Sequence, residues 1–222
     1  MESDVWELLL NSVGPLLMGA VVGTIPLTIL SFIFGLAIAL VVALGRMSLN
    51  KVVSGIAAAY ISLIRGTPLL VQLFIIFYAL PMLGIVIDPY PSAVIAFSLN
   101  VGGYGAEAIR ASILAIPVGQ WEAARTVGMG YTLTLRRVIL PQAMRVAVPP
   151  LSNTFISLVK DTSLASSIMV TELLRRAQEI AAPSYQFLAL YSLAAVIYWL
   201  ICSVLSFGQE RLERYLSRYV SV

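Results

Sequence analysis

The chain has 222 residues, of which 59% are hydrophobic and only 11% are charged, and its mean hydropathy is +0.93. Because soluble domains carry about 25% charged residues, this composition predicts an all-α integral membrane protein and excludes an ordinary soluble domain. The net charge of +3 could point to nucleic acid, but the basic residues gather at the ends of apolar segments, as the positive-inside rule expects. We therefore expect no nucleic-acid partner.

The chain contains no histidine and a single cysteine, Cys202. A disulfide within the chain, a zinc site of cysteine and histidine, and a catalytic Ser/His or Cys/His pair are therefore excluded. We expect no bound metal and no catalytic activity of the chain itself.

Apolar segments of membrane-spanning length recur along the chain, and each could cross a hydrocarbon core of about 30 Å. They predict five transmembrane helices in a single domain over residues 1–222. The expected helices cover residues 19–44, 66–87, 93–113, 141–160 and 187–207. The first is too long for the core of a signal peptide, so we expect it to be retained. Residues 51–65 have helical periodicity, and the sequence leaves open whether they form an interfacial helix or begin the second transmembrane helix.

The basic residues set the expected orientation. Most of the 14 fall in residues 46–65, 110–145 and 211–218, and placing these segments inside puts the N-terminus outside and the C-terminus inside. Lys160, Arg175 and Arg176 are left outside, where Glu172 and Glu179 lie close in sequence.

Small and kinking residues predict how the helices pack. A glycine cluster at residues 102, 103 and 105 favours close contact between helices, because the strand and the Lys-Ser or Lys-Thr of a phosphate loop are missing. Glu107 and Arg110 are spaced as a structural pair. Pro149 and Pro150 are expected to break the fourth helix beside a protein-covered or water-filled path.

Residues near the C-terminal half predict surface helices. Residues 160–183 are polar enough to lie at a surface, with a short helix over 171–176 capped by Thr171. The tail over 209–222 alternates charged and apolar residues, as an interfacial helix would.

A second polar stretch, residues 117–140, lies between apolar segments, and in it Gln120 to Val127 can form two helical turns that Gly128 ends.

The chain has no P-loop, so it cannot cradle ATP itself, and a transporter powered by ATP would need a partner. Glu122-Ala123-Ala124, then Gly128, then Leu140-Pro141 resemble the EAA motif of ATP-binding-cassette importer permeases. Val138 stands where that pattern usually has Ile. Further runs resemble the branch that imports polar amino acids such as cystine, glutamine and basic amino acids. These runs begin at Arg65, Asn100, Pro141, Pro149 and Lys160.

The resemblance implies a type I ABC importer permease fold with five helices in the bacterial inner membrane. It also implies a second permease chain, expected to be identical, an extracytoplasmic amino-acid-binding protein, and a cytosolic ATPase dimer that binds ATP and grips the EAA loop. The chain itself would then hold no cofactor. Coupling is expected to depend on Glu122, Ala123, Ala124 and Gly128.

Polar residues in the third and fourth helices are candidates for the substrate pathway. Thr154, Ser157 and Asp161 share one helical face, and Asp161 could attract an ammonium group while Asn100, Ser157 and Ser163 offer hydrogen bonds. The same residues could instead hold helices together. Relatives that carry cationic amino acids often place an acid where this chain has Thr154, which favours a zwitterionic substrate. The alternative from another class is a self-sufficient secondary transporter or channel, but we find no internal repeat.

Overall fold

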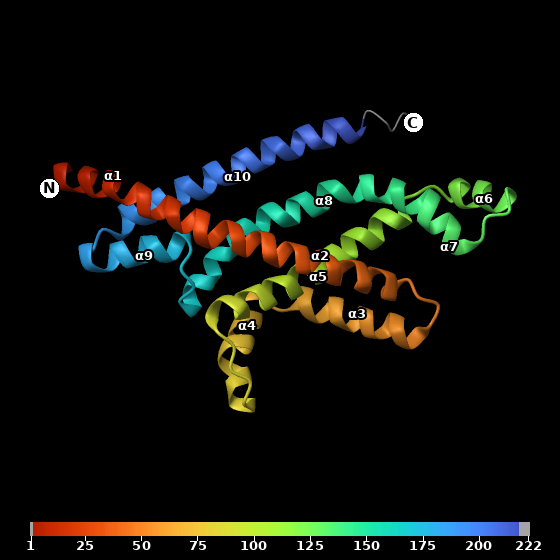
Figure 1. Ribbon diagram of the computed structural model, residues 1–222, viewed down its shortest axis with the longest axis horizontal. Coiled ribbons are helices and arrows are strands. Elements are labelled where there is room, and N and C mark those ends of the chain that lie inside the picture. The colour runs from red at the N-terminus through yellow and green to blue at the C-terminus, as the bar shows by residue number, and fades with distance from the viewer. Residues whose placement is uncertain (1, 218–222) are drawn as a thin grey trace.

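The computed structural model describes residues 2–217, and the ordered elements of that part of the chain are all helical (Figure 1). In chain order they are α1 (Glu2–Gly19), η1 (Ala20–Thr24), α2 (Ile25–Arg46), α3 (Lys51–Gly66), α4 (Leu69–Phe74), η2 (Ile75–Ala79), η3 (Leu80–Leu83), α5 (Pro89–Leu114), α6 (Val118–Thr126), α7 (Tyr131–Thr134), η4 (Leu135–Ile139), α8 (Leu140–Asp161), η5 (Thr162–Ile168), α9 (Leu173–Ser184) and α10 (Phe187–Ser217).

The first helix is much longer than residues 19–44. From Val5 to Arg46 the chain forms one apolar helical span of 42 residues, interrupted only by the π-helical turn η1. The absence of charge marked only part of this helix, because acidic residues in the first turns of a helix are compatible with its dipole. η1 therefore lies inside a continuous element.

Residues 51–65 form a helix of their own, α3 (Lys51–Gly66), which together with Leu69–Leu83 is apolar enough to be one broken span. α3 packs against α2 and α5, and the segment that follows, Leu69–Leu83, is bent by 105° relative to it. The expected helix over 66–87 is thus only the second half of a bent pair, and it ends at Leu83. Pro89 and Pro91 lie in the first turn of α5, where proline fits a helix, instead of forming a turn before it.

α5 is the central helix, with most of its contacts to α2 (Figure 1). The glycine cluster allows this approach. A Cβ on Gly102 would lie 2.5 Å from Ile38 Cγ2, and one on Gly103 would lie 2.6 Å from Ile64 Cγ2. The core around fully buried Phe97 joins α2, α4, α5, α8 and η5. The predicted close packing of these glycines is confirmed.

α8 does not break at Pro149 and Pro150, contrary to the expectation. The helix runs without interruption from Leu140 to Asp161. Two prolines remove two N–H donors, but they leave the later i to i−4 bonds available to continue the helix. The Thr154 hydroxyl donates a hydrogen bond of 2.9 Å to the Pro150 carbonyl one turn earlier.

The C-terminal elements also differ from expectation. α9 begins after Glu172, whose carboxylate accepts from the Leu174 and Arg175 amides, so Glu172 and not Thr171 is the cap. The expected interfacial helix of the tail is the end of α10 as far as Ser217, and the remainder, 218–222, lies outside the described residues.

By length and composition, two described helices can cross a membrane, Val5–Arg46 and Phe187–Leu216, and the bent pair α3 and α4–η3 would be a third. α5 and α8 do not pass that test, since each carries charged and amide side chains. The α2–α3 connection and α6–α7 lie at the same end of the molecule, toward which α10 also runs, while α1 begins at the opposite end (Figure 1).

Candidate functional site

A polar cavity of about 390 Å³ lies where the α3–α4 bend, α5 and α8 meet. Its lining includes four of the five residues expected in the substrate pathway, namely Asn100, Thr154, Ser157 and Asp161. The structure therefore brings together residues that are up to 61 positions apart in the chain. The remaining lining residues are Thr67, Pro68, Leu69, Val101, Tyr104, Asn153 and Leu158.

α8 contributes the polar wall of this cavity. Thr154, Ser157 and Asp161 are spaced three and four residues apart, so they share one helical face. The Asp161 carboxylate is partly buried and has no hydrogen bond or ion pair with any described residue. A carboxylate without a partner costs free energy unless water or a ligand solvates it. The wall is therefore suited to a cationic or ammonium-bearing group.

Asn100 faces the cavity from α5, and it is linked to the bend before α4. Its Nδ2 lies 3.5 Å from the Gln72 Oε1. The Gln72 amide in turn donates to the Ile64 carbonyl at 2.8 Å and to the Thr67 hydroxyl at 2.9 Å. Gln72 thus satisfies backbone oxygen atoms that the bend frees. The sequence reasoning gave Gln72, Thr67 and Tyr104 no role, although all three lie in runs that it singled out.

Ser163 is not a lining residue of the cavity. It lies in η5, where its hydroxyl donates a 2.7 Å bond to the Lys160 carbonyl. Lys160 is exposed and points to a different side of the helix from Asp161, since neighbours on a helix diverge by about 100°. The polar face of the pathway therefore ends at Asp161.

α6 presents the EAA residues at the end of the molecule that holds the α2–α3 connection (Figure 1). Glu122 and Ala123 are exposed, whereas Ala124 is buried against the body of the protein. The small side chain of Ala124 therefore packs within the chain. Gly128 has φ +78, a conformation that favours glycine, and its amide and that of Met129 close the helix on Arg125 and Ala124.

Aromatic and amide contacts fix α6 on the transmembrane body. The Trp121 ring stacks on Tyr131 of α7 with centroids 5.6 Å apart, and Gln142 of α8 donates to the Gln120 side chain at 3.2 Å. Trp121 also packs against the apolar cluster around Ile113 and Ile139. These contacts join α6 to the C-terminal end of α5 and to the start of α8.

The Glu107 and Arg110 pair is confirmed, with Arg110 Nε 3.1 Å from Glu107 Oε2. The two side chains are hydrogen-bonded to each other as an ion pair. Their pairing agrees with the structural role expected for them.

Glu172 is a fully buried carboxylate that the sequence reasoning missed. Besides the Leu174 and Arg175 amides, at 2.9 and 2.7 Å, the Tyr198 hydroxyl donates to it at 2.6 Å and the Thr24 hydroxyl lies at 3.5 Å. Burial raises the pKa of this carboxyl, and the four donors oppose the shift because they favour the ionised form. No local pattern signals this contact, since Thr24 and Tyr198 lie far from it in sequence.

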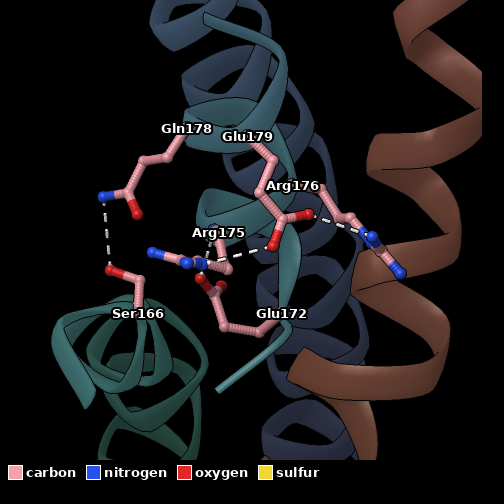
Figure 2. A network of polar contacts seen from close by, with 6 residues as sticks. All are labelled: Ser166, Glu172, Arg175, Arg176, Gln178 and Glu179. Carbon is pink, nitrogen blue, oxygen red and sulfur yellow. Dashed lines mark hydrogen bonds and ion pairs between the residues drawn. The ribbon is translucent and has the colours of Figure 1, made fainter. Parts of the chain in front are cut away.

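The charged residues beside Glu172 pair on the surface of α9 (Figure 2). Glu179 accepts from Arg175 at 3.3 Å and from Arg176 at 3.0 Å, and Gln178 donates to Ser166 at 3.4 Å. Glu172 lies apart from these pairs and is bonded to backbone amides. Arg175 and Arg176, which were expected outside, therefore share Glu179, which neutralises part of their charge.

The family of the chain follows from comparison with known proteins. The family model for the binding-protein-dependent transport system inner membrane component matches residues 31–218, and the chain belongs to this family. It is therefore an inner-membrane permease component of an ABC importer, a class that works with a binding protein and an ATPase. The chain contributes the membrane part of such a system and not its ATP-hydrolysing part.

The most informative relatives are transporters of amino acids. The chain is 60% identical over 217 residues to the L-cystine transport system permease protein TcyB of Bacillus subtilis, which covers 97% of this chain and 93% of that protein. It is 41% identical over 202 residues to the glutamine transport system permease protein GlnP of Escherichia coli K12, with 90% and 92% covered. A solved amino acid ABC transporter bound to histidines is 36% identical with TM-score 0.89, covering 93% of this chain and 96% of that one.

A more distant solved structure matches the fold alone. The MetNI methionine ABC transporter in an inward-facing form has TM-score 0.76 at 22% identity and covers 90% of this chain and 96% of its own. The same arrangement of helices therefore persists where most residues differ.

Proposed function

We propose that this chain is the transmembrane subunit of an ATP-driven importer of polar amino acids, with cystine as the first candidate substrate. The observation that carries the proposal is the 60% identity to the L-cystine permease over nearly the whole length of both chains. The polar cavity supports it, because cystine carries ammonium and carboxylate groups that need polar contacts across the membrane. No feature of the described residues favours a self-sufficient secondary transporter.

The proposed topology has five crossings, formed by α1–α2, the bent pair α3 and α4–η3, α5, α8 and α10. The N-terminus lies outside and the C-terminus inside. The common location of the α2–α3 connection and α6–α7 at one end supports this orientation, since the sequence places most basic residues there. α5 and α8 can cross because Asn100, Thr154, Ser157 and Asp161 face the cavity and Glu107 pairs with Arg110, while exposed Lys160 lies in the last turn of α8.

A second, identical permease chain is proposed to complete the pore. In this single chain Asn153 and Ser157 on α8 are exposed beside the cavity. Polar side chains at membrane depth need protein or water around them, which a second chain would supply across the same face.

Coupling is proposed to run through α6, where Glu122, Ala123 and Gly128 are exposed to a cytosolic ATPase dimer that binds the ATP. Closure of the ATPase would move α6, and Trp121 and Gln142 would pass that movement to α5 and α8. Ala124 would contribute by seating α6 on the body. In this proposal the chain itself holds no cofactor and no metal.

Co-purification with reconstitution tests the proposal. A tagged chain should bring down an ATPase from its own membranes, and proteoliposomes holding that complex with its binding protein should accumulate labelled L-cystine only when ATP is present. Uptake without ATP, driven by an ion gradient, would contradict the proposal and favour a secondary transporter.

The coupling residues have a separate test. Glu122→Lys and Gly128→Asp should abolish substrate-stimulated ATP hydrolysis while the complex still assembles, because both changes alter the exposed surface or the backbone that closes α6. Gly119→Ala, on the same helix with nothing within 4 Å of the added Cβ, is the matched control. Stimulation that survives both changes would place the coupling elsewhere.

A further inference from the structure

Arg65 lies beside the cavity in the last turn of α3, two residues before the lining residue Thr67. Its guanidinium carbon is 5.4 Å from the centre of the Tyr104 ring, and Tyr104 itself lines the cavity. This distance is within the range of a cation–π contact. The cavity therefore has a positive charge held against one of its walls.

The donors of Arg65 are open. No described residue accepts a hydrogen bond from this guanidinium or forms an ion pair with it, whereas Arg110 uses its donors on Glu107. A guanidinium that lies over a ring uses its face and keeps its N–H groups along the edge for a bidentate acceptor such as a carboxylate. The stacked position thus orients an unused carboxylate-binding group.

Arg65 lies away from the end of α3 that carries Lys51. The two residues are separated by about 21 Å along the helix at 1.5 Å per residue, and the Arg65 side chain is exposed. The guanidinium is therefore accessible beside the cavity.

Arg65 and Asp161 lie toward different ends of the cavity. On α5, Tyr104 is one turn nearer to α6 than Asn100. α8 runs in the opposite direction to α5, starting at the α6 end and leading toward α9 (Figure 1). Asn153 is therefore nearer to α6, and Asp161 is about 12 Å farther along the helix. A site that can bind a carboxylate near α6 and an acidic group at the other end together match a substrate that carries a carboxylate and an ammonium group.

We propose that Arg65, held over the Tyr104 ring, binds the α-carboxylate of the transported amino acid on the α6 side of the cavity. The inference rests on the proposed function and goes beyond it, because it assigns the carboxylate of the substrate to a residue outside the cavity's lining. Asp161 would hold the ammonium group at the other end of the cavity. Tyr104 positions the guanidinium and does not itself need to donate a hydrogen bond.

The test is calorimetric titration of the purified permease–ATPase complex, without binding protein, with L-cystine, with L-glutamine and with cystamine, which is cystine without its carboxylates. The wild-type complex should bind L-cystine or L-glutamine at least about tenfold more tightly than cystamine. In Arg65→Gln that preference should disappear through weaker amino-acid binding. Tyr104→Phe should keep it, because the ring remains, and Tyr104→Leu should reduce it by a few fold.

Lys51→Gln, an exposed basic residue at the other end of α3, is the control and should bind like the wild type. Equal affinity of the wild type for cystamine and the amino acids would overturn the inference without any variant. Unchanged amino-acid binding by Arg65→Gln would also overturn it while leaving the proposed importer intact. A wild-type complex that binds none of these molecules would reject the cavity as a substrate site and the inference with it.

Discussion

Two carboxylates in this chain have opposite surroundings. Glu172, at the junction of η1, α9 and α10, is fully buried and accepts from four donors. Asp161, on the wall of the cavity, is only partly buried and has no hydrogen bond or ion pair among the described residues. A saturated buried carboxylate stabilises the fold, whereas an open one in a cavity is available to a ligand.

The junction around Glu172 should be sensitive to size more than to any other change. A Cβ on Gly23 of η1 would lie 2.3 Å from the Thr171 carbonyl oxygen, and that backbone atom cannot move aside without disturbing the cap of α9. Gly23→Leu should therefore prevent accumulation of folded chain in the membrane. The measurement is the amount of monodisperse protein extracted in mild detergent.

Gly14→Leu on the preceding turns of the same helix is the matched control, since nothing lies within 4 Å of an added Cβ there. If both variants accumulate to wild-type levels, then the junction does not hold α1–α2 against α9.

Removing the charge of Glu172 should have a smaller effect of the same kind. Glu172→Gln leaves one acceptor oxygen for the two amides and the Tyr198 hydroxyl, so the free energy of unfolding should fall by about 1–3 kcal/mol. The Tm of the purified complex should drop, and amino-acid uptake per assembled complex should stay near the wild-type value. A loss of uptake at unchanged Tm would contradict the structural role.

Adding a charge to the cavity wall should have the smallest effect. Thr154 and Asp161 share a face of α8, so Thr154→Glu would place a second acid in the same cavity. Binding of L-arginine relative to L-glutamine by the permease–ATPase complex should then increase by a few fold, while Tm changes little. Thr154→Gln, which has the same length and no charge, is the control and should not shift the preference.

The sequence predicted the features that depend on composition and local spacing. The apolar helices, the close contact at Gly102 and Gly103, the Glu107–Arg110 pair and the glycine that ends α6 all follow from rules acting within a few residues of the chain. Their outcome therefore depends little on the rest of the fold.

Contacts between distant segments could not be predicted in the same way. Glu172, the cap of α9, also accepts from Tyr198, and Gln72 donates to the Ile64 carbonyl before the bend. Ala124 is buried where α6 packs against η4 and α7. Pro149 and Pro150 misled the prediction because local rules count the lost donors but not the packing that holds α8 straight. The polar stripe of α8 was visible as a pattern, but its cavity required the positions of α5 and the α3–α4 bend.

The most direct test of the difference between the two carboxylates compares Asp161→Asn with Glu172→Gln. For each variant, ATP-driven amino-acid uptake is divided by the amount of assembled complex measured in the same membranes. We expect Asp161→Asn to assemble at the wild-type level with uptake reduced at least about tenfold, since a neutral amide loses its attraction for an ammonium group. Poor assembly of Asp161→Asn with normal uptake per complex would contradict the account and would show that Asp161 holds helices together.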